Sequence, residues 1–189
     1  DNASTDNSAE CLDAAFPEVR LVRSPRNTGI AGGNNLGIRA TSGRYVLFLN
    51  NDAVVLPGTV DRLFAFLEEH PQAAGAGGRL LNPDRTFQSG DYGFPSFWRE
   101  FLFVTHLGVL FNRHYPSHPP SAEVHEAEWM STAFALFRRE ALDQVGLVDE
   151  EYFIYSDETD LFYRLKQAGW KIYHLPDVET IHLGGCSLT

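Results

Sequence analysis

The segment YVLFLNNDAVV, residues 45–55, constrains the fold more than any other stretch of this chain. Residues 45–49 form an uninterrupted apolar run, which is typical of a strand covered on both faces, because such a strand has no side that meets water. Two amides and a carboxylate follow at 50–52, and a second apolar run comes directly after them. These polar residues fit a tight turn, and they equally fit a metal site at the mouth of a buried strand.

Strand-like and helix-like segments alternate along the rest of the chain. The expected strands are 19–24, 45–49, 73–81 and 170–176, and the expected helices are 57–71 and 155–169. Residues 128–146 read as a strand that continues into a helix, and residues 31–43 as a helix or a tight loop. This alternation predicts an α/β fold with a mainly parallel central sheet flanked by helices. In such sheets ligands bind at the carboxyl ends of strands, which is where Asp52 is expected.

Composition narrows the classes of function. The chain has 189 residues, 43% of them hydrophobic, enough for one α/β domain with its own core. Its formal net charge is -10, and Lys and Arg are not gathered into a stripe, which argues against a nucleic-acid partner. Cys11 and Cys186 offer no disulfide framework and favour a reducing compartment. No apolar run reaches the roughly 18 residues of a membrane span, and no signal peptide is recognisable.

Three carboxylates crowd into one expected helical turn, at Asp157, Glu158 and Asp160. Acidic residues are common in the first turn of a helix, and one of them can cap it, which explains one or two of the three. Three close carboxylates repel one another, which raises the pKa of at least one of them and suits a general base. Both interpretations stay open on the residues alone.

Two histidines near the end of the chain differ in their surroundings. His182 follows a strand-like run and precedes two glycines, so it can reach a metal ion or a phosphate. His174 lies within the apolar segment 170–176 and is expected in the core. The glycine-rich stretch 29–37 matches neither the dinucleotide fingerprint nor the P-loop, so it indicates another kind of nucleotide loop or tight helix packing.

Together these segments resemble the family 2 glycosyltransferases, which have the GT-A fold, and in particular their rhamnosyltransferase-like branch in bacterial polysaccharide synthesis. DNASTDNS (1–8) is similar to the family's Asp-Asn-x-Ser-x-Asp-Gly-Ser segment. Residues 26–52 resemble its Asn-x-Gly…Gly-x-Tyr stretch, which ends in a metal-binding Asp-x-Asp. Residues 129–170 resemble the acceptor half, with its acidic pair and Asp-Leu-x-x-Arg, and HLGG (182–185) resembles a late His-x-Gly-Gly.

The resemblance implies inverting transfer of a sugar from a nucleoside diphosphate donor to a hydroxyl of a saccharide or lipid-linked saccharide, assisted by Mg²⁺ or Mn²⁺. Asp157 or Glu158 would deprotonate the acceptor, with Glu158 preferred because it stands second in the pair. Trp129 and Asp160 would lie on the acceptor side. The residues implied at the nucleotide sugar are Asp1, Asn27, Gly29, Gly33, Asn34, Asn51 and Asp52, and those implied at the metal are Asp52 and His182.

The sequence departs from the family pattern at three places. Asn50 replaces the first acid of the metal motif, and the acidic pair is Asp157-Glu158 where the family has Glu-Asp. The family's first strand would precede Asp1, so we expect the sheet to lack it and activity to be weak or absent unless that segment is supplied. Full-rate transfer by the 189-residue chain would contradict this expectation. An alternative function is therefore a sugar-nucleotide-binding module with little or no turnover.

We expect one domain over 1–189, with a nucleotide-sugar-binding half (1–81), a variable excursion (82–128) and an acceptor-binding, catalytic half (129–189). Within the excursion, aromatic residues at near-helical spacing in FWREFLFVTHLGVLF fit either core packing, the commoner environment for such residues, or contact with a membrane surface or lipid acceptor. The family resemblance implies a cytoplasmic location, with the inner face of the cell membrane as the place of such contact.

Overall fold

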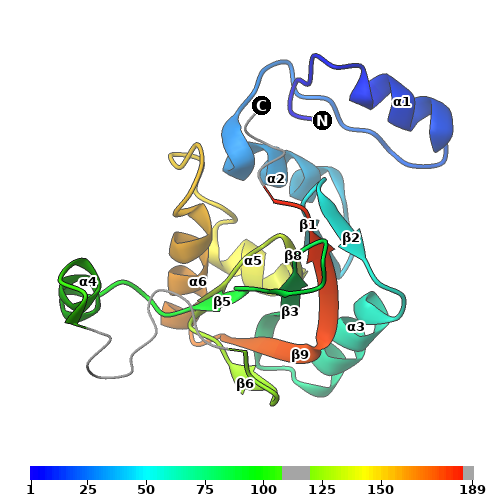
Figure 1. Cartoon of the computed structure of the whole chain (residues 1–189). Helices are drawn as coiled ribbons and strands as arrows, with labels where there is room; N and C mark the ends of the chain where they lie inside the picture. Colours follow the sequence, from blue (N-terminus) through cyan, green and yellow to red (C-terminus); the bar gives the residue numbers. More distant parts are fainter. Residues whose placement is uncertain (108–119, 185–189) are drawn as a thin grey trace.

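A mixed β-sheet forms the centre of the computed structural model, which describes residues 1–107 and 120–184 (Figure 1). The strands are β1 (Tyr45–Leu49), β2 (Ala53–Val55), β3 (Ala73–Leu81), β4 (Phe87–Gln88), β5 (Asp91–Tyr92), β6 (His125–Glu126), β7 (Trp129–Met130), β8 (Phe134–Arg138) and β9 (Lys171–His182). The helices are α1 (Ser8–Ala15), α2 (Gly29–Ala40), α3 (Thr59–Glu69), α4 (Phe97–Val104), α5 (Arg139–Val145) and α6 (Asp157–Gln167).

The sheet has the strand order β1-β8-β3-β9-β2, with β4 beside β3 and β6 beside β9. The α/β class is confirmed, but the expectation of a mainly parallel sheet is wrong. Among the described pairs only β3 and β9 run parallel. The reason is that β8 inserts antiparallel between β1 and β3, which themselves point the same way. Separately, β5 and β7 form a two-stranded antiparallel sheet.

The expected strand at 19–24 is also absent from the structure. This segment has no strand assignment, and its backbone bonds to another part of the chain are those of Val22 and Ser24 with Asp1, while the Val19 N–H bonds locally to the Phe16 carbonyl. The Asp1 amino group donates to the Val22 carbonyl at 2.8 Å, and the Ser24 N–H donates to the Asp1 carbonyl at 2.9 Å. A strand needs a ladder of such bonds, and a single bridging residue does not make one.

Two apolar clusters cover the two faces of the sheet, and β8 contributes to both because its side chains alternate. Phe134 and Leu136 face α3, and Ala135 and Phe137 face the side of α5 and α6. In Figure 1, α3 lies on one side of the sheet and α5 and α6 lie on the other. The α3 cluster includes Leu63, Phe66 and Leu67, and the opposite cluster includes Leu142, Leu161, Phe162 and Leu165. This arrangement holds α6, which carries the acidic residues, firmly against the sheet.

Strand β9 is longer than the sequence predicts and continues through Pro176 to His182. Proline cannot donate to a ladder, so it is tolerated within a strand only where the pairing is interrupted. The parallel pairing with β3 shifts register at that point, from Gly78 opposite Leu175 to Arg79 opposite Glu179. The extension matters for the site, because it brings His182 back across the sheet to β2.

The excursion contains an exposed aromatic helix, α4, which projects away from the sheet (Figure 1). None of its side chains is buried, and Phe97, Trp98 and Val104 are 76%, 68% and 73% exposed. Core packing is therefore wrong for this helix. The remainder of the aromatic segment, from residue 108 to 111, lies outside the described residues, as does the second glycine of HLGG.

Candidate active site

The first part of the site is a carboxylate and an imidazole at the end of β9. The antiparallel register of β2 and β9 places Ala53 opposite His182, which brings the preceding Asp52 beside the histidine ring. Asp52 Oδ1 lies 3.2 Å from His182 Nε2, and Asp52 is 7% exposed. The backbone holds this position, since the Leu183 N–H donates to the Asp52 carbonyl at 2.9 Å. Asp52 and His182, both expected at the metal from the sequence, therefore meet in the fold.

Gln88 fixes the ring of His182, and no motif in the sequence points to this residue. His182 Nδ1 lies 2.7 Å from Gln88 Oε1, while Gln88 Nε2 donates to Asn82 Oδ1 at 3.1 Å. The second bond orients the amide so that its oxygen faces the ring, and an oxygen only accepts. His182 therefore carries its proton on Nδ1 and presents a bare Nε2 towards Asp52.

This geometry fits a divalent cation. Two lone-pair atoms, Asp52 Oδ1 and His182 Nε2, face each other without hydrogen-bond geometry, and Asp52 Oδ1 is buried with no hydrogen-bond partner among the described residues. A buried acceptor without a donor is costly, so the pair calls for a cation between or beside its atoms. Where the sequence lacks a second acid, the Asn50 amide nitrogen lies 3.4 Å from His182 Nε2 and donates a long hydrogen bond to it, so a cation at Nε2 would displace this contact.

The second part of the site is Glu158, on the first turn of α6. Its Oε1 accepts hydrogen bonds from both the N–H and the hydroxyl of Thr132, each at 2.6 Å. The next residue, Ala133, accepts a hydrogen bond from the Asn50 N–H at 3.0 Å. One short piece of backbone before β8 therefore links the carboxylate of α6 to the turn that carries Asp52.

Both members of the acidic pair have raised pKa values. Burial raises the pKa of Glu158, the Thr132 hydrogen bonds oppose that rise, and the charge of Asp157 adds to it. Burial also raises the pKa of Asp157, against backbone hydrogen bonds at the helix start. A carboxylate whose pKa is raised accepts a proton more readily, which suits a general base. Glu158 is the one anchored by Thr132, the residue that precedes Ala133.

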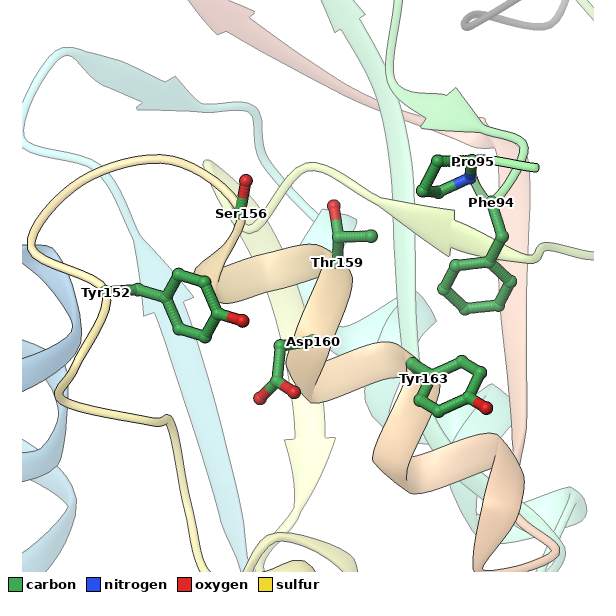
Figure 2. A pocket seen from close by; sticks show the side chains of 7 residues that line it. All are labelled: Phe94, Pro95, Tyr152, Ser156, Thr159, Asp160 and Tyr163. Carbon is green, nitrogen blue, oxygen red and sulfur yellow. The ribbon is translucent and has the colours of Figure 1, made fainter. Parts of the chain in front are cut away.

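A pocket of about 340 Å³ opens beside the start of α6. Its lining residues are Phe94, Pro95, Tyr152, Ser156, Thr159, Asp160 and Tyr163. Figure 2 shows Phe94 and Pro95, from the excursion, on the side of Tyr163, with the hydroxyls of Ser156 and Thr159 along the helix start. Its volume is at the low end of small-molecule sites, and aromatic and hydroxyl groups together are suited to a sugar. Asp160, expected on the acceptor side, lines this pocket but is also paired with Arg164 at 2.7 Å.

Trp129, the other residue expected on the acceptor side, supports the pocket from behind. Its indole N–H donates to the Gly93 carbonyl at 3.0 Å, and its ring stacks on Tyr92 with centroids 4.3 Å apart. Gly93 directly precedes Phe94 of the pocket wall. The tryptophan therefore holds the wall in place, and it is not itself among the lining residues.

The turn before α6 is strained. Tyr155 and Ser156 have φ angles of 64° and 63°, in the left-handed region that non-glycine residues seldom occupy. Strain of this kind persists only where the surroundings enforce it, and it often accompanies ligand sites. Here the loop is tied to α2 by the Ile30 N–H, which donates to the Phe153 carbonyl at 3.0 Å.

Gly29 and Asn27, both expected at the nucleotide, have local structural tasks. Gly29 has a φ of +76°, and an added Cβ would lie 2.3 Å from the Phe153 carbonyl oxygen, so only glycine fits there. Asn27 Oδ1 accepts from the Gly29 N–H at 2.9 Å and from the Asn2 amide at 3.1 Å. Asn2, which the sequence analysis missed, also accepts from the N–H and hydroxyl of Thr28.

The other nucleotide-side residues are spread over two places. Asp1 and Gly33 line a cavity of about 360 Å³ between the chain start and α2. Asn51 is exposed on the β1–β2 turn next to Asp52, and Asn34 is half-buried on α2. The fold therefore joins Asn51, Asp52 and His182 at one edge and links Glu158 to it through Thr132 and Ala133, while Asp1 and Gly33 line a separate hollow.

A model of the glycosyl transferase family 2 matches residues 1–146, most of the chain. The chain belongs to glycosyl transferase family 2. It is 29% identical to the N-acetylglucosaminyl-diphospho-decaprenol L-rhamnosyltransferase of Mycobacterium tuberculosis, over 96% of this chain and 64% of that protein. It is 24% identical to the rhamnosyltransferase WbbL of Escherichia coli, over 82% of this chain and 60% of that protein. The chain thus spans less than two thirds of either relative.

Solved glycosyltransferases share the fold. GalNAc-T7, solved with UDP, GalNAc and Mn²⁺, has a TM-score of 0.66 at 14% identity and covers 95% of this chain with 35% of its own. The mannosyltransferase PcManGT of Pyrobaculum calidifontis, solved with GDP-Man and Mn²⁺, has a TM-score of 0.64 at 17% identity, over 98% of this chain and 47% of its own. The GT-A fold and the rhamnosyltransferase-like family resemblance are thus confirmed.

Proposed function

We propose that this chain is the catalytic domain of an inverting glycosyltransferase of cell-surface polysaccharide synthesis, which moves a sugar from a nucleoside diphosphate to a hydroxyl group. The observation that carries the proposal is the pairing of Asp52 with His182, which suits a cation, together with the link of the Asp52 turn through Ala133 and Thr132 to the half-buried carboxylate of Glu158. Neither alone would indicate transfer, since the pair could serve binding and the base could be structural.

On the donor side, Asp52 and His182 would hold Mg²⁺ or Mn²⁺. When bound there, the cation offsets the negative charge of the diphosphate leaving group. Gln88 keeps the histidine nitrogen aimed at the ion, and the exposed Asn51 amide stands where the donor would approach. The likeness to folds solved with UDP or GDP-Man and Mn²⁺ supports a nucleotide-sugar donor.

On the acceptor side, Glu158 would take the proton of the attacking hydroxyl. Thr132 fixes Oε1, so that the carboxylate does not swing away from the sheet edge. The pocket of Phe94, Tyr152 and Tyr163 would hold the acceptor sugar against its rings, with the Ser156 and Thr159 hydroxyls at its polar end. Attack from this side, opposite the leaving group, is what inversion requires.

We further propose that α4 meets a membrane surface that carries a lipid-linked acceptor. Its side chains Phe97, Trp98 and Val104 are exposed, and the mycobacterial relative is named for a decaprenyl-linked sugar. Within residues 1–107 and 120–184, no helix is both long enough and apolar enough to cross a bilayer. Contact through α4 at the inner face of the cell membrane is therefore a surface association. Loss of vesicle co-sedimentation in Trp98→Ser with Phe97→Ser, but not in the α1 control Leu12→Ser, would support it.

The experiment for the proposed function is a transfer assay with a panel of nucleotide sugars, with and without Mn²⁺, together with donor-dependent thermal shifts. It uses this chain and a form extended at its N-terminus. We expect nucleoside diphosphate release that needs Mn²⁺ and acceptor and is lost in Glu158→Gln but not in the exposed control Glu140→Gln. Donor binding without transfer in both forms would favour the alternative, a binding module.

A further inference from the structure

A second group of metal-ligating side chains lies apart from Asp52 and His182. Asp91 of β5, His125 of β6 and His174 of β9 each offer one ligand atom, and these atoms lie within 4.8 Å of one another. They come from both ends of the excursion and from the central sheet. No spacing motif joins them in the sequence, so only the fold brings them together.

Strand pairing explains the meeting. β6 runs antiparallel to β9, and their register sets His125 directly opposite His174, with ring centroids 5.1 Å apart. Directly opposed residues on one face of a sheet are close enough to share a ligand. Asp91 reaches the pair from the small β5–β7 sheet, where it is 3% exposed.

His174 is the most telling member, because it is 2% exposed and unsatisfied. Apart from a weak approach to the backbone of Gly78, neither of its ring nitrogens has a hydrogen-bond partner among the described residues. A buried polar ring without partners is costly and needs an explanation. Burial lowers the pKa of His174, which keeps the ring neutral, as a metal ligand must be.

His125 is held in the tautomer that a ligand needs. Its Nδ1 lies 3.0 Å from the Glu123 carbonyl oxygen, which only accepts, so the proton is on Nδ1. In the neutral ring a bare Nε2 would then face Asp91 Oδ2 at 2.8 Å, and either a second proton or a cation must lie between them. Fixing one imidazole nitrogen through a carbonyl is the usual way in which proteins aim the other at a metal.

We propose that Asp91, His125 and His174 bind a transition-metal dication of the zinc type, which fastens the excursion to the central sheet. Two imidazoles and a carboxylate suit zinc-type ions better than Mg²⁺ or Mn²⁺. Ligand distances of about 2.0–2.1 Å around a tetrahedral ion set the ligand atoms roughly 3.3 Å apart. Small side-chain rotations therefore close the group around an ion, and the 31% exposed His125 side chain leaves a path for it.

The charges around His174 are compatible with a bound dication. Arg79 also faces His174 and disfavours a nearby positive charge. Its own charge is shared with Glu179, 3.5 Å away, and one of its nitrogens donates to the Ser121 carbonyl at 2.8 Å. Asp91 supplies the negative charge inside the group. The ion replaces the proton between His125 and Asp91, so its binding releases a proton.

The position of the Asp91–His125–His174 group indicates what a bound metal would do. Asp91 directly precedes Tyr92, which stacks on Trp129, and Trp129 in turn holds Gly93 and the pocket wall. A metal that fixes Asp91 to β9 thus fixes the wall of the acceptor pocket relative to the sheet. It would do so without touching the donor, which distinguishes it from the Asp52–His182 pair.

The test is a metal titration of the chelator-treated chain without nucleotide. Co²⁺ is added and followed by its visible absorption, Zn²⁺ is used to displace it, and bound metal is counted by elemental analysis. Two variants, His125→Gln and His174→Gln, change the proposed zinc-type site. His182→Gln changes the Asp52–His182 pair, and the exposed His106→Gln is the matched control. Circular dichroism of each variant identifies any that fail to fold.

We expect the wild-type chain to bind one Co²⁺, to exchange it for Zn²⁺, and to gain thermal stability. His125→Gln, the partly exposed ligand, should weaken binding at least tenfold, and His174→Gln should do the same, while His182→Gln and His106→Gln should not. Wild-type chain that binds neither ion would overturn the proposal, whatever the variants do. Binding that survives in His125→Gln, or that is lost in His182→Gln, would overturn it as well.

Discussion

Strand β9 carries two histidines that face carboxylates, and the two places differ in chemistry. At its end, His182 meets Asp52, so one imidazole and one carboxylate are offered. In its interior, His174 meets His125 and Asp91, so two imidazoles and one carboxylate are offered. The first set leaves most positions of an ion to substrate oxygens, as Mg²⁺ and Mn²⁺ require, and the second favours a nitrogen-preferring ion. One strand can thus supply ligands for a cation at the donor and for a structural cation.

The residues around the two histidines of β9 also differ. The Asp52 turn is linked through the Ala133 carbonyl to Thr132 and so to Glu158, the proposed base. The interior group is linked through Asp91 to the Tyr92–Trp129 stack and the pocket wall. We infer that the strand end serves the reaction, whereas the interior group keeps the acceptor side in shape.

The largest expected effect separates the two carboxylates. Asp52→Asn should lower transfer by at least ~10³-fold, because charge stabilisation by a bound metal contributes several kcal/mol to the barrier. Asp91→Asn should leave the thermal shift caused by nucleotide and Mn²⁺ in place. Steady-state kinetics and donor titrations of both variants measure this contrast, and equal losses of donor binding in the two would abolish the distinction.

The next effect concerns Glu158, the proposed base, which is linked to the Asp52 turn through Thr132 and Ala133. Glu158→Gln should lower kcat by ~10²–10⁴-fold and spare donor binding, because the amide keeps the Thr132 contacts but cannot take a proton. Glu140→Gln, at an exposed position of α5, is the matched control. A Glu158→Gln variant that retains wild-type turnover would show that Asp157 or another residue is the general base.

A smaller effect is expected at Gln88, the residue that orients the ring of His182. Gln88→Ala should weaken Mn²⁺ binding in the presence of nucleotide by ~10–100-fold, because His182 loses the group that fixes its tautomer. Zn²⁺ binding at the interior group should be unchanged, as it should in the exposed control Gln167→Ala. Calorimetry measures the affinity for each ion. A Gln88→Ala variant with normal Mn²⁺ affinity would show that Gln88 does not set the tautomer needed for metal binding.

The smallest effect is on stability and has a definite pH sign. Burial raises the folded-state pKa of Glu158, so in the range above the ordinary carboxyl pKa the folded state holds more protons than the unfolded one, and stability falls as pH rises through that range. Glu158→Gln removes this loss. Thermal midpoints should therefore favour the variant at neutral pH, with the advantage shrinking towards acid. An advantage that grows in acid would contradict the assigned direction.

The parts of the molecule that follow from local pattern were predictable. The strand 45–49, the amphipathic helix after Pro57 and the acidic start of α6 all lie where their patterns indicate. The expectation that this strand is covered on both faces is wrong for the described residues, because β1 is an edge strand in which Phe48 is buried and Leu49 is 46% exposed. The closeness of His182 to Asp52 agrees with the expectation that both lie at the ligand-binding edge of the sheet, although His182 ends β9 and does not follow it. For the strand and the two helices, the informative residues are close together in the sequence.

What could not be predicted depends on pairing between distant segments. Nothing in β8 itself indicates that it inserts antiparallel between β1 and β3, since a buried strand reads the same in either direction. Gln88 has no motif and gains its role because it lies beside His182 in space. His174 read as a core residue, which it is, but its partners Asp91 and His125 emerge only from the sheet register.

The most direct test of the central claim, that Asp52 and His182 form the donor cation site, is Mn²⁺ binding followed by electron paramagnetic resonance with a panel of nucleoside diphosphates. We expect a bound Mn²⁺ signal that depends on nucleotide, disappears in Asp52→Asn and His182→Gln, and persists in Asp61→Asn, an exposed residue of α3. A nucleotide-dependent signal that survives in both Asp52→Asn and His182→Gln would contradict it.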